Sequence, residues 1–108
     1  MHRDLKHLNI LVSGVGEDGS PKVLITDFGM SIKLEQGEYF TPVKKGTPGY
    51  QAPEVIKKQP CDFKVDVWAL GVILYSLLCA NVPFKGQSDS DINQATLYDE
   101  LVFTSVAA

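Results

Sequence analysis

The sequence predicts a mainly α-helical α+β fold, and three stretches of its 108 residues support this. Residues 67–80 carry no charge and are nearly all apolar, which favours a core helix. Residues 10–12 and 23–26 are short apolar runs separated by turn-forming residues, as in a two-stranded hairpin with a long loop. Residues 89–98 mix apolar and polar positions as a short amphipathic helix does.

The apolar stretch at residues 67–80 is too short to cross a bilayer, because a hydrocarbon layer of roughly 30 Å needs about 20 helical residues. Asp62 can cap the start of this helix, and Asn81 followed by Pro83 can end it. Being apolar all round, the helix should be surrounded by protein. Asp66 interrupts the pattern. It is either a solvated carboxylate near the positive end of the helix dipole or a buried one that holds the backbone of a neighbouring loop.

Composition narrows the classes of partner. A net charge of −3 and a pI near 5.2 give no electrostatic footprint for nucleic acid or an anionic membrane. Cys61 and Cys79 fall at opposite ends of the predicted helix, too far apart for a disulfide, so we expect free thiols. Residues 1–9 contain no apolar run of the signal-peptide type, so we expect a cytoplasmic or nuclear setting.

Polar side chains gather where the predicted hairpin begins and ends. Asp4 and Asn9 precede its first strand, and Asp27 follows its second. Asp and Asn supply the hard oxygen ligands that Mg²⁺ takes, and Lys6 could neutralise a phosphoryl oxygen, which leaves Asp4 to accept a proton. Any one of these residues alone is more simply a solvated loop residue. The combination indicates a site for a cation and a phosphate.

Five motifs resemble those of protein kinase catalytic domains, in the same order and with the same spacing. They are HRDLKHLN at 2–9 for the catalytic loop, DFG at 27–29 for the magnesium-binding triplet, GTPGY at 46–50, APE at 52–54 and DVWALG at 66–71. Together they cover nearly all of the chain.

Finer features resemble one group of that family. Lys6 two residues after Asp4, together with GTPGYQAPEV at 46–55, is similar to serine/threonine kinases. The acidic insert that begins at residue 17 and YSLLCANVPF at 75–84 resemble the calcium/calmodulin-dependent kinases. Calmodulin dependence itself is not readable from these residues.

The resemblance implies a partial kinase domain over residues 1–108, namely a segment of the C-terminal lobe. It would contain the catalytic-loop hairpin, an activation segment at 27–54 and the buried central helix. No glycine-rich loop, strand lysine or helix glutamate precedes residue 1, so we expect the N-terminal β lobe to be absent here. The family transfers the γ-phosphate of ATP to Ser or Thr hydroxyls of protein substrates, but this chain alone should be inactive. The alternative is a truncated, non-catalytic interaction module.

The resemblance also assigns roles at the site. Asp4 would orient the substrate hydroxyl and accept its proton, and Lys6 would hold the γ-phosphate of ATP. Asn9 and Asp27 would bind the Mg²⁺ ions that bridge the ATP phosphates. Leu11 would lie under adenine, although a plain core leucine in a strand explains it equally well.

Other residues would support this site. His2 could be taken for a metal ligand or a base, but the resemblance favours a packed structural residue against Phe28, which Gly29 follows in the DFG motif. Asp66 would accept hydrogen bonds from the catalytic-loop backbone, which favours the buried interpretation of that residue. In the family, the counterpart of Glu54 pairs with an arginine later in the chain, so we expect Glu54 to lack that partner here.

Arg3 would meet a phosphate on the activation segment, added by an upstream activating kinase. Thr41 is the nearest candidate, but it lies two residues earlier before Gly46 than the family's usual threonine, and an exposed loop threonine often has no such role. The catalytic loop also departs from the group at His7 and Leu8, where Pro and Glu are usual.

Thr47 would contact Asp4 and Lys6 beside the substrate hydroxyl. The alternative is that residues 47–49 form only a turn.

Overall fold

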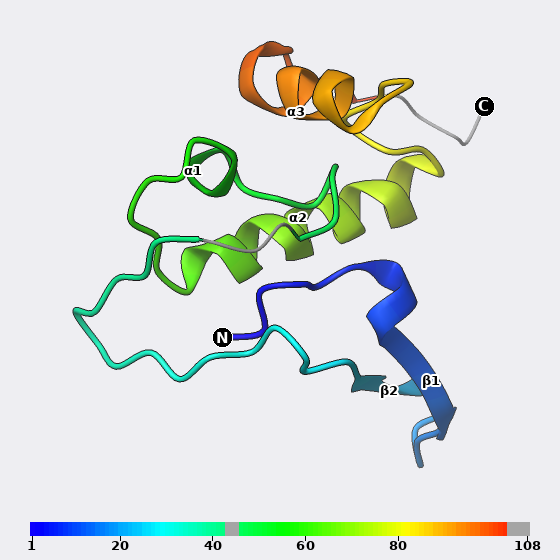
Figure 1. Ribbon diagram of the computed structural model, residues 1–108. Coiled ribbons are helices and arrows are strands. Elements are labelled where there is room, and N and C mark those ends of the chain that lie inside the picture. The colour runs from blue at the N-terminus through cyan, green and yellow to red at the C-terminus, as the bar shows by residue number, and fades with distance from the viewer. Residues whose placement is uncertain (43–45, 104–108) are drawn as a thin grey trace.

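The computed structural model describes residues 1–42 and 46–103 (Figure 1). In chain order its elements are a 3₁₀ helix at His7–Asn9, strands β1 (Ile10–Val15) and β2 (Pro21–Ile25), and helices α1 (Pro53–Ile56), α2 (Lys64–Cys79) and α3 (Asp89–Tyr98). Figure 1 shows α2 through the middle of the molecule, with α1 and α3 toward one side and the hairpin toward the other. The mainly helical α+β architecture matches the sequence prediction.

The two strands form the expected antiparallel hairpin. Ile10 pairs with Ile25, and the register shifts between Val12 and Gly14. Gly14 has φ of 151°, a conformation that costs a glycine little and other residues much, so this position suits the bulge. At the mouth of the hairpin the backbone N–H of Thr26 donates to the carbonyl of Asn9 at 2.8 Å, which brings the end of β2 beside the start of β1.

Helix α2 begins and ends close to the predicted residues. Phe63 is its N-cap, and Asp62 helps the first turn by accepting a hydrogen bond from Lys64 N at 3.0 Å. At the other end Ala80 takes a left-handed conformation with φ of 50°, so the chain leaves the helix just before Asn81. Cys61 and Cys79 are free thiols, as expected.

Two small clusters of the core lie on one side of α2, which we call its loop-facing side, and Val72, Phe84 and Ala95 are buried outside these clusters. Leu5 from the amino-terminal loop packs with Ala69 and Ile73 of α2. Ala52 and Cys61 pack with Val65, one turn earlier on the same stripe of the helix. The i, i+4, i+8 spacing of the three α2 residues produces this continuous buried stripe.

The expectation that α2 is surrounded by protein was wrong for the described residues. Its open side is exposed and consists of Val67, Leu70, Leu74, Leu77 and Leu78. Leu77 alone is 77% exposed. The two clusters use a single stripe of α2, and no described helix or strand covers the open side, although Leu101 and Phe103 border a groove beside Leu74 and Leu78. Apolar composition indicates that a surface favours burial, but it does not supply the element that buries it.

Helix α3 occupies the predicted residues. Its N-cap is Ser88, whose side chain accepts a hydrogen bond from Asp91 N at 3.1 Å. The chain between α2 and α3 is held by Phe84, which is buried and stacks on Trp68 with ring centroids 6.0 Å apart. Within the described ranges, no helix is both long and apolar enough to cross a membrane.

Candidate active site

Three side chains form a hydrogen-bonded chain at the candidate site. Lys6 Nζ donates to Thr47 Oγ1 at 2.9 Å, and the Thr47 hydroxyl donates to Asp4 Oδ1 at 2.9 Å. Lys6 Nζ also lies 4.0 Å from Asp4 Oδ2. The side chains of Lys6 and Asp4 are only 22% and 15% exposed, so their charges interact through partly desolvated surroundings. The expected contacts of Thr47 are therefore present, although residues 48–50 do form a turn.

His2 is a packed residue, as expected. Its ring is buried and lies 5.2 Å, centroid to centroid, from that of Phe28. Asp4 N donates to His2 Nδ1 at 3.1 Å, so Nδ1 is the acceptor nitrogen. The proton is then on Nε2, which donates to the carbonyl of Thr26 at 2.8 Å. Nδ1 therefore holds the catalytic loop together, and Nε2 links that loop to the residue that follows β2.

Asp66 of α2 holds the backbone of the catalytic loop. Its Oδ2 accepts from His2 N at 2.8 Å and its Oδ1 accepts from Arg3 N at 2.9 Å. Two successive backbone N–H groups thus point at one carboxylate, an arrangement known to bind anions, and Arg3 itself has a left-handed φ of 72°. Asp66 is half-buried, so of the two interpretations left open by the sequence the structure supports the one in which it grips a loop.

Asn9 and Asp27 lie at the mouth of the hairpin, where a cation site was expected. Asn9 is buried and its Nδ2 donates to the carbonyl of Asp4 at 2.8 Å, so its amide oxygen is the atom left for a ligand. Asp27 is exposed, and its Oδ1 accepts from Gly29 N at 3.3 Å. A Cβ on residue 29 would lie only 3.3 Å from that oxygen, so glycine leaves the carboxylate room.

This donor set fits Mg²⁺, which binds proteins through one or two carboxylates and completes its shell with phosphate oxygens and water. No three His, Cys, Asp or Glu side chains come together as a metal site in the part of the chain that the structure describes.

Two apolar residues near this mouth are open to solvent. Leu11 is 51% exposed and Phe28 is 62% exposed. The interpretation of Leu11 as a plain core leucine is therefore wrong for the described structure. β1 and β2 form the whole described sheet, and every residue of the two strands except Ile10 is exposed.

Arg3 and Thr41 do not face each other. Arg3 Nε donates to the carbonyl of Met30, and the guanidinium carbon lies 5.3 Å from the ring centroid of Phe40. Thr41 is exposed, and residues 43–45 of the activation segment lie outside the described residues. Glu54 is half-buried, and among the described residues it forms no ion pair.

Sequence reasoning missed two contacts. Phe40 lies outside every motif, so nothing in the pattern linked it to Arg3. The second contact joins His7 Nδ1 to the hydroxyl of Tyr50 at 2.7 Å. Desolvation raises the pKa of Tyr50, which keeps this phenol protonated. An aromatic residue in GTPGY and a histidine in the catalytic loop were the available signals for that pair.

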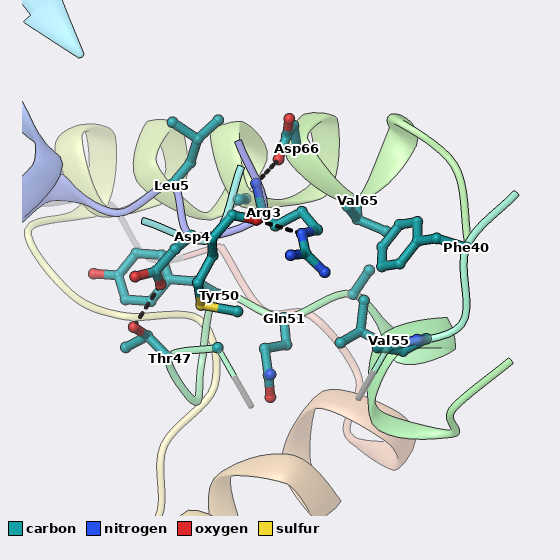
Figure 2. A pocket seen from close by; sticks show the side chains of 15 residues that line it. Arg3, Asp4, Leu5, Phe40, Thr47, Tyr50, Gln51, Val55, Val65 and Asp66 are labelled. Carbon is teal, nitrogen blue, oxygen red and sulfur yellow. Dashed lines mark hydrogen bonds between the residues drawn. The ribbon is translucent and has the colours of Figure 1, made fainter. Parts of the chain in front are cut away.

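Figure 2 shows how several of these side chains converge on one cavity. Its volume is about 30 Å³, enough for one or two water molecules. Arg3, Asp4 and Thr47 line it, together with Phe40 and Tyr50. Catalytic loop, activation segment and α2 therefore meet around one small, partly polar space.

Comparison with known proteins agrees with this arrangement. The protein kinase domain family model matches residues 1–106. Calcium/calmodulin-dependent protein kinase type 1 from Macrobrachium nipponense is 43% identical over 105 residues, which are 97% of this chain and 29% of that protein. The Caenorhabditis elegans type 1 kinase is 43% identical over 103 residues, 95% of this chain and 28% of its own length. Human type 1B is 43% identical over 105 residues, with coverage of 97% and 29%.

The chain thus spans less than a third of the length of these relatives. The expected resemblance to the calcium/calmodulin-dependent group is confirmed. By family match, motif order and site geometry, this chain belongs to the protein kinase domain family.

Proposed function

We propose that these residues form the catalytic-loop side of a serine/threonine protein kinase that transfers the γ-phosphate of ATP to protein substrates. The observation that carries the proposal is the Lys6–Thr47–Asp4 hydrogen-bond chain. It joins a cation suited to a phosphoryl oxygen with a carboxylate suited to a hydroxyl proton. Relatives named as calcium/calmodulin-dependent kinases support the serine/threonine assignment.

In this proposal Asp4 orients the substrate hydroxyl and accepts its proton as the oxygen attacks the γ-phosphorus. Thr47 holds Asp4 Oδ1 by its hydroxyl, which leaves Oδ2 to face the substrate. Lys6 reaches the same place and neutralises charge on the transferred group. Rate enhancement then comes from position and charge, since no covalent intermediate with the protein is required.

Asn9 and Asp27 would hold Mg²⁺ through their side-chain oxygens. When bound, the ion neutralises negative charge on the ATP phosphates. The protein's part is to leave the side-chain oxygens of Asn9 and Asp27 accessible to the ion. The Asn9 amide nitrogen is tied to Asp4 O, and glycine at position 29 leaves space beside Asp27.

We further propose that the 108 residues assayed by themselves do not transfer phosphate. Leu11 and Phe28, the apolar residues nearest the proposed nucleotide site, are exposed, so water reaches the place where ATP would lie. Electrostatic stabilisation of a phosphoryl group depends on a dry, preorganised site. A second lobe that covers these residues would supply one.

A non-catalytic interaction module is the second candidate, and the open side of α2 favours it. Beside that side lies an apolar groove of about 330 Å³ lined by residues that include Trp68, Leu74 and Phe103. Large exposed apolar surfaces of this kind mark interaction sites. The two candidate functions differ in whether the Asp4 carboxylate is needed for the activity of the protein.

The test is phosphoryl transfer by the full-length gene product with ATP, Mg²⁺ and peptides that contain Ser or Thr. Asp4→Asn should lower kcat by about 10²–10⁴ with little change in ATP affinity, as loss of a positioned base does. The matched control is Asp99→Asn, at an exposed aspartate beyond α3, which should behave as wild type. Turnover by Asp4→Asn equal to that of the control would contradict the assignment.

A regulatory role for Thr41 also remains a proposal. In the full-length protein, Thr41→Ala would resist activation by an upstream kinase. Equal activity of Thr41→Ala and wild type after such treatment would remove Thr41 from regulation.

A further inference from the structure

Phe40 covers one face of the Arg3 guanidinium. The distance of 5.3 Å from the guanidinium carbon to the ring centroid is within the range of a cation–π interaction. Arg3 Nε meanwhile donates to the carbonyl of Met30, also in the activation segment. Figure 2 shows the Arg3 side chain directed into the cavity, with Phe40 among the residues around it. The catalytic-loop arginine therefore already has two partners in the activation segment.

The backbone of Phe40 is fixed independently of its ring. Phe40 N donates to Cys61 O at 2.8 Å, and Cys61 N donates to Phe40 O at 2.7 Å. Phe40 also packs against the buried cluster of Ala52, Cys61 and Val65. One residue thus joins the activation segment to the segment that leads into α2.

Carboxylates are engaged elsewhere around this arginine. Asp66 accepts the N–H groups of His2 and Arg3, and Asp4 accepts the hydroxyl of Thr47. Within the described ranges Arg3 forms no ion pair. The Phe40 ring face and the Met30 carbonyl are therefore the partners of the Arg3 guanidinium among the described residues.

Thr41 is oriented away from this contact. Phe40 is in an antiparallel bridge, where successive side chains point to opposite faces. Phe40 is half-buried and Thr41 is exposed, as that alternation requires. Thr41 is also absent from the residues that line the cavity around Arg3.

We propose that Phe40 is a phosphate-independent anchor of the activation segment. Its ring holds Arg3 and its backbone holds Cys61, so the segment is ordered without an anion on Arg3. The consequence for catalysis rests on the proposed kinase function. The anchor itself can be measured without phosphoryl transfer, so the two can fail separately.

The first test is amide hydrogen exchange of Phe40 and Cys61, followed by NMR in the 108-residue chain. Phe40→Leu keeps an apolar side chain but removes the ring. It should speed hydrogen exchange of both amides by about 2- to 30-fold, because that range corresponds to the free energy of a cation–π contact. Phe40→Tyr keeps the ring and should restore wild-type rates. Tyr39→Ala, at the exposed neighbouring aromatic residue, is the matched control and should change neither amide.

The second test uses Cys61 as a probe in a Cys79→Ser background, where it is the one remaining thiol. Phe40→Ala should make Cys61 react faster with a disulfide reagent by at least about tenfold, and Phe40→Tyr should not. The amides of Val72 and Ile73 in α2 report whether a variant still folds. If Phe40→Ala does not fold, the reactivity of Cys61 is measured in Phe40→Leu instead.

Two results would overturn the proposal. One is equal exchange of the Phe40 and Cys61 amides in Phe40→Leu and Phe40→Tyr, because packing alone would then account for the contact. The other is a wild-type segment whose two amides become protected only when inorganic phosphate is added, because an anion would then be the anchor. Unchanged wild-type protection on addition of phosphate is the expected outcome.

Discussion

The two sides of α2 are similarly apolar, yet the structure uses them differently. The loop-facing side, with Val65, Ala69 and Ile73, is buried against the catalytic loop and the segment around Ala52. The open side is exposed along its length. Hydrophobicity does not distinguish them. The difference is Asp66, which lies beside the buried stripe and takes the two backbone N–H groups that direct the loop onto this side.

The largest expected effect comes from shortening adjacent residues on opposite sides. Ile73 is 8% exposed and Leu74 is 56% exposed. Ile73→Ala should lower the free energy of unfolding by about 2–4 kcal/mol, because it removes buried methylene groups and leaves a cavity. Leu74→Ala should change it by less than about 0.5 kcal/mol. Urea denaturation measures both, and equal losses would mean that the two sides do not differ.

A second prediction concerns association through the open side. Exposed apolar surface of this extent favours self-association of the isolated 108 residues and binding of apolar dyes. Leu77→Glu should reduce both, since Leu77 is the most exposed large apolar residue of α2. Light scattering and dye fluorescence report the change. The comparison variant is Lys64→Glu, at an exposed position where α2 begins, and association lowered equally by both would show a general charge effect.

A smaller effect is expected from pH at the loop-facing side. Burial first, and then the charges of Glu54 and Asp62, raise the pKa of the Cys61 thiol. Below the ordinary thiol pKa of about 8.5 both folded and unfolded chains hold the proton, so stability is unaffected. Above it the unfolded chain ionises first, and the free energy of unfolding should fall as pH rises.

Denaturation between pH 8 and 9.5 would measure this slope. Cys61→Ala should flatten it, whereas Cys79→Ala, at the other end of α2, should leave it in place. A slope that persists in Cys61→Ala would assign it to another group.

Much of the site could be predicted because its residues belong to motifs with fixed spacing. The contacts of Asp66 with the catalytic loop and of Thr47 with Asp4 and Lys6 are examples. The hairpin followed from short apolar runs separated by turn residues, and α3 followed from an amphipathic pattern, all of which are local signals. The short helix α1, a single turn around Glu54, was too brief to give a periodic pattern.

The rest could not be predicted because it depends on tertiary contacts. Phe40 meets Arg3 only once the activation segment has turned back on the loop, and no local pattern encodes that path. The exposure of the open side likewise depends on which elements pack against α2. Apolar residues at Leu70 and Leu74 would have the same sequence pattern whether covered or not.

The most direct test of the account asks whether the Asp66 carboxylate places the catalytic loop on α2. NMR exchange rates of the His2 and Arg3 amide protons should rise by about 10- to 100-fold in Asp66→Ala, because each loses a hydrogen bond to a charged acceptor. The matched control is Asp62→Ala, which removes a carboxylate bonded only to Lys64 N among the described residues and should leave both rates unchanged. Wild-type protection of the His2 and Arg3 amides in Asp66→Ala would contradict the claim.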